Sequence, residues 1–146
     1  MRADEIMESC LRTGACLKAR EMAEGVRGWK DLSSLLFRSQ SREYCVVHKF
    51  PTLDMFRSVP PEVRDYGIYV DAGGVRSCKR NTALIGNTVG TVVADGTDHI
   101  FKVVVMHGAK ATVHASNYAV VHVAMTDDAS VEADADSTSY IFFERH

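Results

Sequence analysis

The chain has 146 residues and a mass of 16.1 kDa, the size of one ordinary domain. Hydrophobic residues make up 46% and charged residues 25%, which are globular proportions and exclude a collagen-like or wholly disordered protein. The formal net charge of -2 argues against a polycation that coats nucleic acid or acidic membranes. The longest apolar runs, residues 101–106 and 118–125, are too short to span a bilayer, so we expect no membrane partner.

The start of the chain and its cysteines indicate a compartment. Residues 1–16 mix acidic and basic side chains with apolar ones and do not form the apolar core of a secretory signal, so we expect a cytoplasmic protein. Without a secretion signal or a Cys-x-x-Cys pair, the four cysteines are expected to be reduced thiols. They are Cys10, Cys16, Cys45 and Cys78.

Residues 1–65 predict an N-terminal helical region, because apolar side chains recur there at three- and four-residue spacings. Pro60-Pro61 is expected to end this region. The predicted helix-capping residues are Asp31, Ser41 and Thr52. On the helix that follows Ser41, the predicted inward-facing residues are Tyr44, Cys45, Val47 and His48.

Residues 66–146 predict a β region, because segments rich in Val, Ile, Thr and aromatic residues alternate with Gly, Asn and Asp clusters. The Gly73-Gly74 pair is interpreted as a turn. The predicted strands are residues 68–71, 82–85, 91–94, 101–106, 110–115, 118–124, 130–134 and 139–143.

Three hexapeptides in this region resemble one another. Residues 90–95, 111–116 and 129–134 share a small residue, Thr or Ser, Val, any residue and then Ala, except that the first has Ala at the same fifth place after Val-Val. Their first residues are 21 and 18 positions apart, and a period near 20 is typical of one coil of a β-solenoid. The predicted fold class is therefore α+β, with a helical region followed by a short single-stranded parallel β-helix. An antiparallel β-sandwich or barrel is the alternative.

The alternation within the repeats predicts a narrow interior, since alanine flanks valine on one face of each strand. The predicted inward residues are Ala111, Val113, Ala115, Ala129, Val131 and Ala133. In this alignment His114 lies between Val93 and Glu132. Because a last coil leaves unpaired strand edges, the helical region or a second subunit is expected to cover at least one end.

Candidate chemical groups are sparse. His99, His107, His114 and His122 lie within 24 residues but lack metal-ligand spacing, and the acidic run at residues 127–136 matches no calcium-binding loop. Cys45 and His48 could touch on a helix, but Cys45 is interpreted as a core residue. The sequence therefore predicts no catalytic residue, no metal ligand and no cofactor.

Residues 42–57 have the pattern of a helix-turn-helix, because Cys45, Phe50 and Met55 fall five apart as core positions of that motif do. Lys49 stands where the turn glycine is usual, and a simple packed α-hairpin is the other interpretation. If the segment binds DNA, the contacting residues are predicted to be Arg42, Lys49, Thr52, Arg57 and Ser58.

Residues 42–57 together with residues 111–123 resemble small proteins carried by phages and mobile elements of gut bacteria, a resemblance that implies no activity. The C-terminal third is also similar in style to bactofilin-like and other short β-solenoids, whose stacked coils serve as assembly surfaces.

These observations predict a non-catalytic interaction or assembly protein that uses solenoid edges and faces for self-association or for binding another protein. The first alternative is a DNA-binding accessory factor that uses residues 42–58, with the solenoid as an oligomerisation module. The second alternative is a small enzyme or metal-binding protein.

Overall fold

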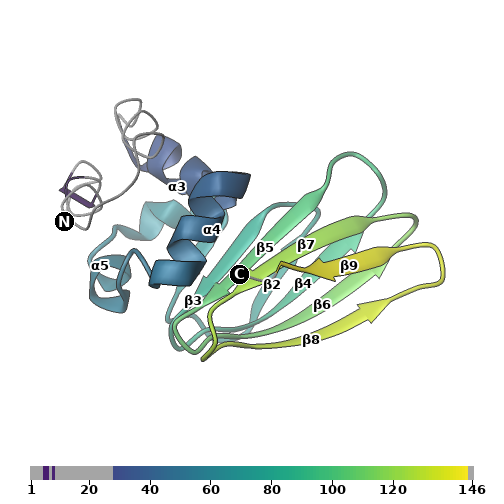
Figure 1. Cartoon of the computed structure of the whole chain (residues 1–146). Helices are drawn as coiled ribbons and strands as arrows, with labels where there is room; N and C mark the ends of the chain where they lie inside the picture. The colour runs from purple at the N-terminus through teal and green to yellow at the C-terminus, as the bar shows by residue number, and fades with distance from the viewer. Residues whose placement is uncertain (1–4, 7, 9–27, 145–146) are drawn as a thin grey trace.

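The computed structural model describes residues 5, 6, 8 and 28–144, so most of the helix predicted near the N-terminus lies outside the described residues. Four helical elements precede a run of strands (Figure 1). The helical elements are α3 (Trp29–Phe37), α4 (Ser39–His48), α5 (Leu53–Arg57) and the 3₁₀ helix η1 (Pro61–Tyr66). The strands are β1 (Ile68–Val70), β2 (Val75–Cys78), β3 (Thr82–Ile85), β4 (Val89–Asp95), β5 (Phe101–Met106), β6 (Lys110–Ser116), β7 (Val120–Met125), β8 (Ser130–Ala135) and β9 (Tyr140–Phe143).

The helix starts differ in part from the predicted ones. Gly28 occupies the N-cap of α3, and Asp31 lies in the first turn, where its negative charge favours the helix N-terminus. Helix α4 starts two residues before Ser41, whose hydroxyl donates instead to the carbonyl of Leu35. Only the predicted cap Thr52 is confirmed, since its side chain accepts a hydrogen bond from the backbone N–H of Met55 at 3.3 Å.

The buried face of α4 is also different from the predicted one. Arg42, Cys45 and Val46 are buried at i, i+3 and i+4 spacing, whereas Val47 is 51% exposed. The prediction of Val47 and His48 as inward residues was wrong because Arg42, a charged residue, belongs to the inward face. Pro60-Pro61 does not end the helical region either, because Pro61 begins η1 at a position that proline favours.

The β region is a parallel solenoid, as predicted. Odd-numbered strands form a five-stranded sheet in the order β1-β3-β5-β7-β9, and even-numbered strands form a four-stranded sheet in the order β2-β4-β6-β8. Every strand pairing is parallel, so the antiparallel sandwich or barrel alternative was wrong. Strand β2 was not predicted, because its sequence Val-Arg-Ser-Cys carries only one of the β-branched or aromatic residues that mark the others.

The register confirms one repeat alignment and corrects the other. Gly90 pairs with Ala111 and Val92 with Val113, as the 21-residue offset predicts. Val113 pairs with Ala133 rather than with Val131, so the second offset is 20 residues, not 18. A shift of two preserves which side chains face inward, so the hydrophobic pattern alone could not distinguish the two registers.

The interior of the solenoid is filled asymmetrically. The four-stranded sheet supplies mostly small inward residues, such as Ala94, Ala111 and Ala115, and the five-stranded sheet supplies larger ones, such as Phe101 and Val121. All five side chains are at most 5% exposed. The predicted slim, alanine-lined interior is therefore correct for one wall only.

The helices lie on the outer face of the five-stranded sheet rather than over its last coil (Figure 1). Leu36, Phe37 and Phe56 pack there against outward residues of β3 and β5, including Ile85 and Val104. Strand β3 is consequently buried along its whole length, with helices on one side and the solenoid interior on the other.

Candidate interaction surface

The last coil is the place where the solenoid stops without a covering element among the described residues. Strands β8 and β9 are the edge strands of the two sheets, and each pairs on one side only. An edge strand presents unpaired backbone N–H and C=O groups that can pair with another chain. We name β8 and β9 the terminal edge.

Inward-facing side chains of the terminal edge are exposed because no further coil covers them. Ala133 pairs with the fully buried Val113 but is itself exposed, and Phe143, which pairs with the fully buried Val123, is 43% exposed. The predicted inward orientation of Ala129, Val131 and Ala133 agrees with the register, although only Ala129 is buried.

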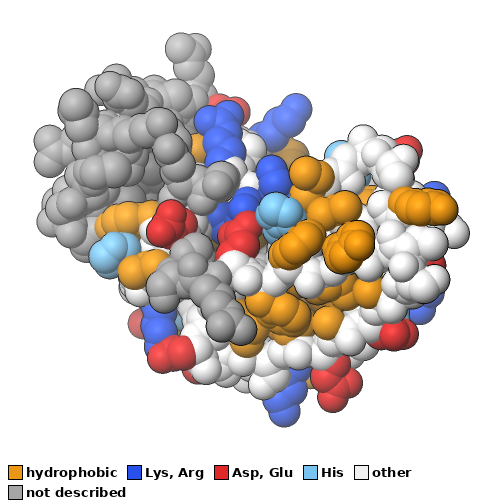
Figure 2. All heavy atoms as spheres, turned by 45° about the vertical axis from the view of Figure 1, so that its right-hand side comes forward, with side chains coloured by type: hydrophobic (Ala, Val, Ile, Leu, Met, Phe, Trp, Pro, Cys, Tyr) orange, Lys and Arg blue, Asp and Glu red, His pale blue; other side chains and the backbone are white. Residues whose placement is uncertain are grey.

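Exposed aromatic side chains gather at the same end. Phe142 is 50% exposed and Tyr140 is 63% exposed, and their rings stack with centroids 6.0 Å apart. Tyr118, 67% exposed, precedes β7, the neighbour of β9. Figure 2 shows hydrophobic side chains gathered on this face of the molecule. Clustered exposed aromatic residues are typical of protein-binding surfaces.

The outward face of β8 is acidic. Glu132 and Asp134 both point away from the interior and are exposed. Asp134 lies 3.4 Å from His114 on the neighbouring strand, through its Oδ2 and the histidine Nδ1. The corrected register explains this contact, since the sequence alignment had placed Glu132 beside His114.

Asp136 follows β8 and organises the adjacent turn. It accepts hydrogen bonds from the hydroxyl and the backbone N–H of Thr138, and from the backbone N–H of Asn117 on the preceding coil. The hydroxyl of Thr138 stabilises the carboxylate and lowers the pKa of Asp136 to about 2. This carboxylate therefore stays charged at every physiological pH.

An ion pair holds the end of β9 to the helical region. Arg42 on α4 donates from Nε to Glu144 Oε2 at 2.9 Å, and a second guanidinium nitrogen contacts the other carboxylate oxygen. A third donates to the carbonyl of Phe37. Partial burial raises the pKa of Glu144, but the hydrogen bond and charge of Arg42 outweigh it, and the pKa is lowered overall. His122 adds a contact at 3.3 Å.

Residues 49–57 run along one corner of the solenoid and contact successive coils. Arg57 forms an ion pair with Asp71, in the turn after β1, with an Nε to Oδ2 distance of 2.7 Å. The carbonyl of Pro51 lies 2.8 Å from Nε2 of His107, in the turn after β5. Lys49 Nζ lies 2.6 Å from Asp127, in the turn after β7. We name residues 49–57 the corner segment.

The turns beneath the corner segment have one length in every coil, which is why the segment can follow them. Five positions separate the last paired residue before each turn from the first after it. These residues are Val70 and Val75, Ile85 and Gly90, Val105 and Lys110, and Met125 and Ser130. Gly86, between β3 and β4, has a φ of 70°, and an added Cβ would lie 2.5 Å from Asp71 Oδ1.

All five residues predicted to contact DNA have partners within the chain. Arg42 is 2% exposed and pairs with Glu144. The other four partnerships are those of Lys49 with Asp127, Thr52 with Met55, Arg57 with Asp71, and Ser58 with the Met55 carbonyl. Helix α5 has five residues, which leaves little surface for a DNA groove. DNA binding stays a prediction, and its strongest predicted cation is buried.

The other predicted chemical groups do not converge. No group of three or more His, Cys, Asp or Glu side chains in the described part of the chain could hold a metal ion. Cys45 lies in the core beneath the helices, and His48 is exposed and packs its ring against Tyr44. Cys78 is exposed on β2, whereas Cys10 and Cys16 lie outside the described residues.

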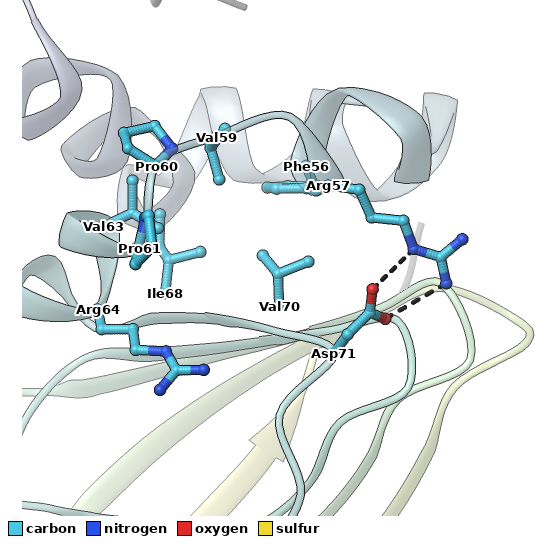
Figure 3. A pocket seen from close by; sticks show the side chains of 10 residues that line it. All are labelled: Phe56, Arg57, Val59, Pro60, Pro61, Val63, Arg64, Ile68, Val70 and Asp71. Atoms are coloured by element: carbon cyan, nitrogen blue, oxygen red, sulfur yellow. Dashed lines mark hydrogen bonds and ion pairs between the residues drawn. The ribbon is translucent and has the colours of Figure 1, made fainter.

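A shallow pocket of about 310 Å³ lies beside β1, at the opposite end of the stack from the terminal edge (Figure 3). Apolar side chains of α5, η1 and β1 line it, including Phe56, Val63 and Val70. The Arg57–Asp71 ion pair borders one side of the pocket and Arg64 the other. The hydrogen bond from Arg57 lowers the pKa of Asp71.

Comparisons with protein-family models, with curated proteins and with solved structures give no match. The resemblance to phage and mobile-element proteins therefore stays a prediction. Within residues 28–144 and the three described residues before them, no helix is long and apolar enough to cross a membrane.

Proposed function

We propose that this chain is a non-catalytic assembly protein that associates with other chains through its terminal edge. The observation that carries the proposal is the exposure of side chains that every earlier coil buries, on two strands whose backbone edges are unpaired. Strand addition at such an edge satisfies backbone groups and buries the apolar side chains in one step.

Exposed aromatic residues strengthen the proposal. Tyr140, Phe142 and Phe143 are at least 43% exposed on one four-residue strand, and a folded monomer gains nothing from leaving them in water. The covered sheets behave differently, because inward residues of β5 and β7 are fully buried.

Light scattering coupled to size-exclusion chromatography tests this proposal. We expect the wild-type chain to associate in a concentration-dependent way, and Phe142→Lys to shift it toward the monomer by placing a charge in the interface. The matched control is Val89→Lys, because Val89 is 57% exposed at the start of β4, away from the terminal edge.

A wild-type chain that stays monomeric up to its solubility limit would overturn the proposal. Equal weakening by Phe142→Lys and Val89→Lys would overturn it as well, because the effect would then come from added charge anywhere on the surface. Circular dichroism of each variant establishes that the fold is retained.

A further inference from the structure

The two edges of the four-stranded sheet carry opposite charges in one column of paired residues. The register aligns Arg76 on β2, Thr91 on β4, Thr112 on β6 and Glu132 on β8. All four side chains point away from the interior, and the two at the ends of the column are exposed. Neither Arg76 nor Glu132 has a hydrogen bond or ion pair to another described residue.

From this column we infer that the chain assembles head to tail, with β8 of one copy paired in parallel with β2 of the next. The inference rests on the proposed function and names the partner as a second copy of this chain. If the stack continues in the register that it has within the chain, Arg76 of the next copy lies directly beside Glu132. Neighbouring strands are about 4.8 Å apart, which is within reach of an ion pair.

A second charge pair supports the same arrangement. Lys79 follows β2 and lies 3.9 Å from Asp95 through Nζ and Oδ2, so its ammonium group already points along the stack. Asp95 pairs with Ser116 in the next coil, and Asp136 occupies the corresponding position in the last one. In the continued stack, Lys79 of the next copy reaches the carboxylate of Asp136, which is charged at neutral pH.

The five-stranded sheet adds an apolar contact. The carbonyl of Gly67 accepts a hydrogen bond from Ala83, so Gly67 occupies the position in the first coil that Phe143 has in the last one. The residues before Gly67 form η1 instead of a strand. Strand β9 therefore meets η1 of the next copy, whose Pro61 and Val63 line the apolar pocket (Figure 3).

Charge also argues against a symmetric dimer in which β8 pairs with its own copy. Such an antiparallel pair would place Glu132 and Asp134 against the same two residues of the partner, and like charges on adjacent strands repel. A head-to-tail contact uses two different surfaces and leaves one of each free, so it produces chains or rings longer than a dimer.

Crosslinking tests the geometry directly, because Cys78 is a native exposed thiol on β2. Within the chain, Cys78, Val93, His114 and Asp134 form one column, so residues 78 and 134 lie three strand spacings apart. In the head-to-tail stack, Asp134 lies beside Cys78 of the next copy. Asp134→Cys treated with a short bis-maleimide is therefore expected to give a ladder of covalent oligomers, and the ladder is expected to disappear in Asp134→Cys/Cys78→Ser.

Persistence of a covalent dimer in Asp134→Cys/Cys78→Ser would indicate a symmetric contact between two terminal edges and would overturn the head-to-tail inference. Crosslinks in the wild-type chain at the same level as in Asp134→Cys would overturn it too, because they would arise from native cysteines. Each reaction is run on the full chain at a concentration where light scattering detects association.

Charge reversal tests the energetics. Arg76→Glu and Glu132→Arg are each expected to weaken self-association by about tenfold, because attraction becomes repulsion at one contact. A 1:1 mixture of the two variants is expected to restore it, since every joint in an alternating chain again pairs opposite charges.

The outcomes separate the two proposals. If Phe142→Lys dissociates the assembly but Arg76→Glu does not, the terminal edge is the interface and the head-to-tail inference is wrong. If both charge reversals weaken association but the mixture fails to restore it, residues 76 and 132 do not face each other and the inference is wrong as well.

Discussion

Strands β6 and β8 occupy equivalent positions in neighbouring coils, yet one is buried and the other is not. Val113 on β6 is fully buried, and its register partner Ala133 on β8 is exposed. The strand pattern is the same in both, and what differs is whether another strand lies on the far side. Burial in a solenoid is therefore a property of the stack, and the last coil keeps a core-like pattern that only a partner can complete.

The largest expected effect comes from placing a charge at the two matched positions. Val113→Asp buries a carboxylate without a partner, so we expect it to lower the free energy of unfolding by more than about 4 kcal/mol or to prevent folding. Ala133→Asp leaves its carboxylate in water and is expected to cost less than about 1 kcal/mol. Urea denaturation at low protein concentration measures both, and similar losses would show that the last coil is covered in the monomer.

The two arginine ion pairs provide the second comparison. Arg42→Ala removes a buried guanidinium, leaves Glu144 partly buried and unpaired, and is expected to cost about 3 kcal/mol. Arg57→Ala removes a pair whose side chains are 42% and 34% exposed, so we expect a loss below about 1 kcal/mol. Thermal unfolding measures the difference, and hydrogen exchange is expected to show faster opening of β9 in Arg42→Ala alone.

This difference also decides which variants can test DNA binding. Loss of binding in Arg42→Ala would be confounded by the loss of stability. Arg57→Ala is the more informative variant, because its side chain is on the surface and the fold is expected to tolerate the change. A salt-dependent affinity for duplex DNA that Arg57→Ala lowers would favour the DNA-binding alternative.

The smallest expected effect is a dependence of stability on acid pH. The pKa of Glu144 is lower in the folded chain than its ordinary value of 4.5, so its contribution to stability is fully present above 4.5 and is lost as the pH falls through the folded value. Glu144→Gln is expected to flatten the pH dependence of the melting temperature in this acid range. Glu132→Gln, at an exposed position, is the control and should leave the slope as in the wild type.

The sequence predicted the solenoid because period-two alternation and a repeat near 20 residues are local signals. They identified eight of the nine described strands and the offset between residues 90 and 111. The third repeat misled the alignment, since matching Val131 to Val113 ignores that the coil there has 20 residues. The difference between 21 and 20 lies in the loop between Asp95 and Phe101, which is one residue longer than its counterpart between Ser116 and Val121.

The candidate surface was predictable only in kind. Open edges follow from any short solenoid, but the aromatic cluster at β9 and the charge column from Arg76 to Glu132 depend on which coil is last and which residues align. The strand β2 was missed, and with it the basic end of that column. A count of exposed aromatic residues in residues 140–143 could have indicated the surface, since four apolar residues in succession do not alternate.

The amino-acid sequence by itself determined the two-part architecture, the parallel stacking and the alternation of inward and outward side chains, because these depend on periodicity along the chain. Tertiary structure alone decided that Arg42 is buried against Glu144, that the corner segment follows one column of turns, and that the helices cover the outside of one sheet. Such features depend on contacts between residues up to 102 positions apart, whose partners no local pattern specifies.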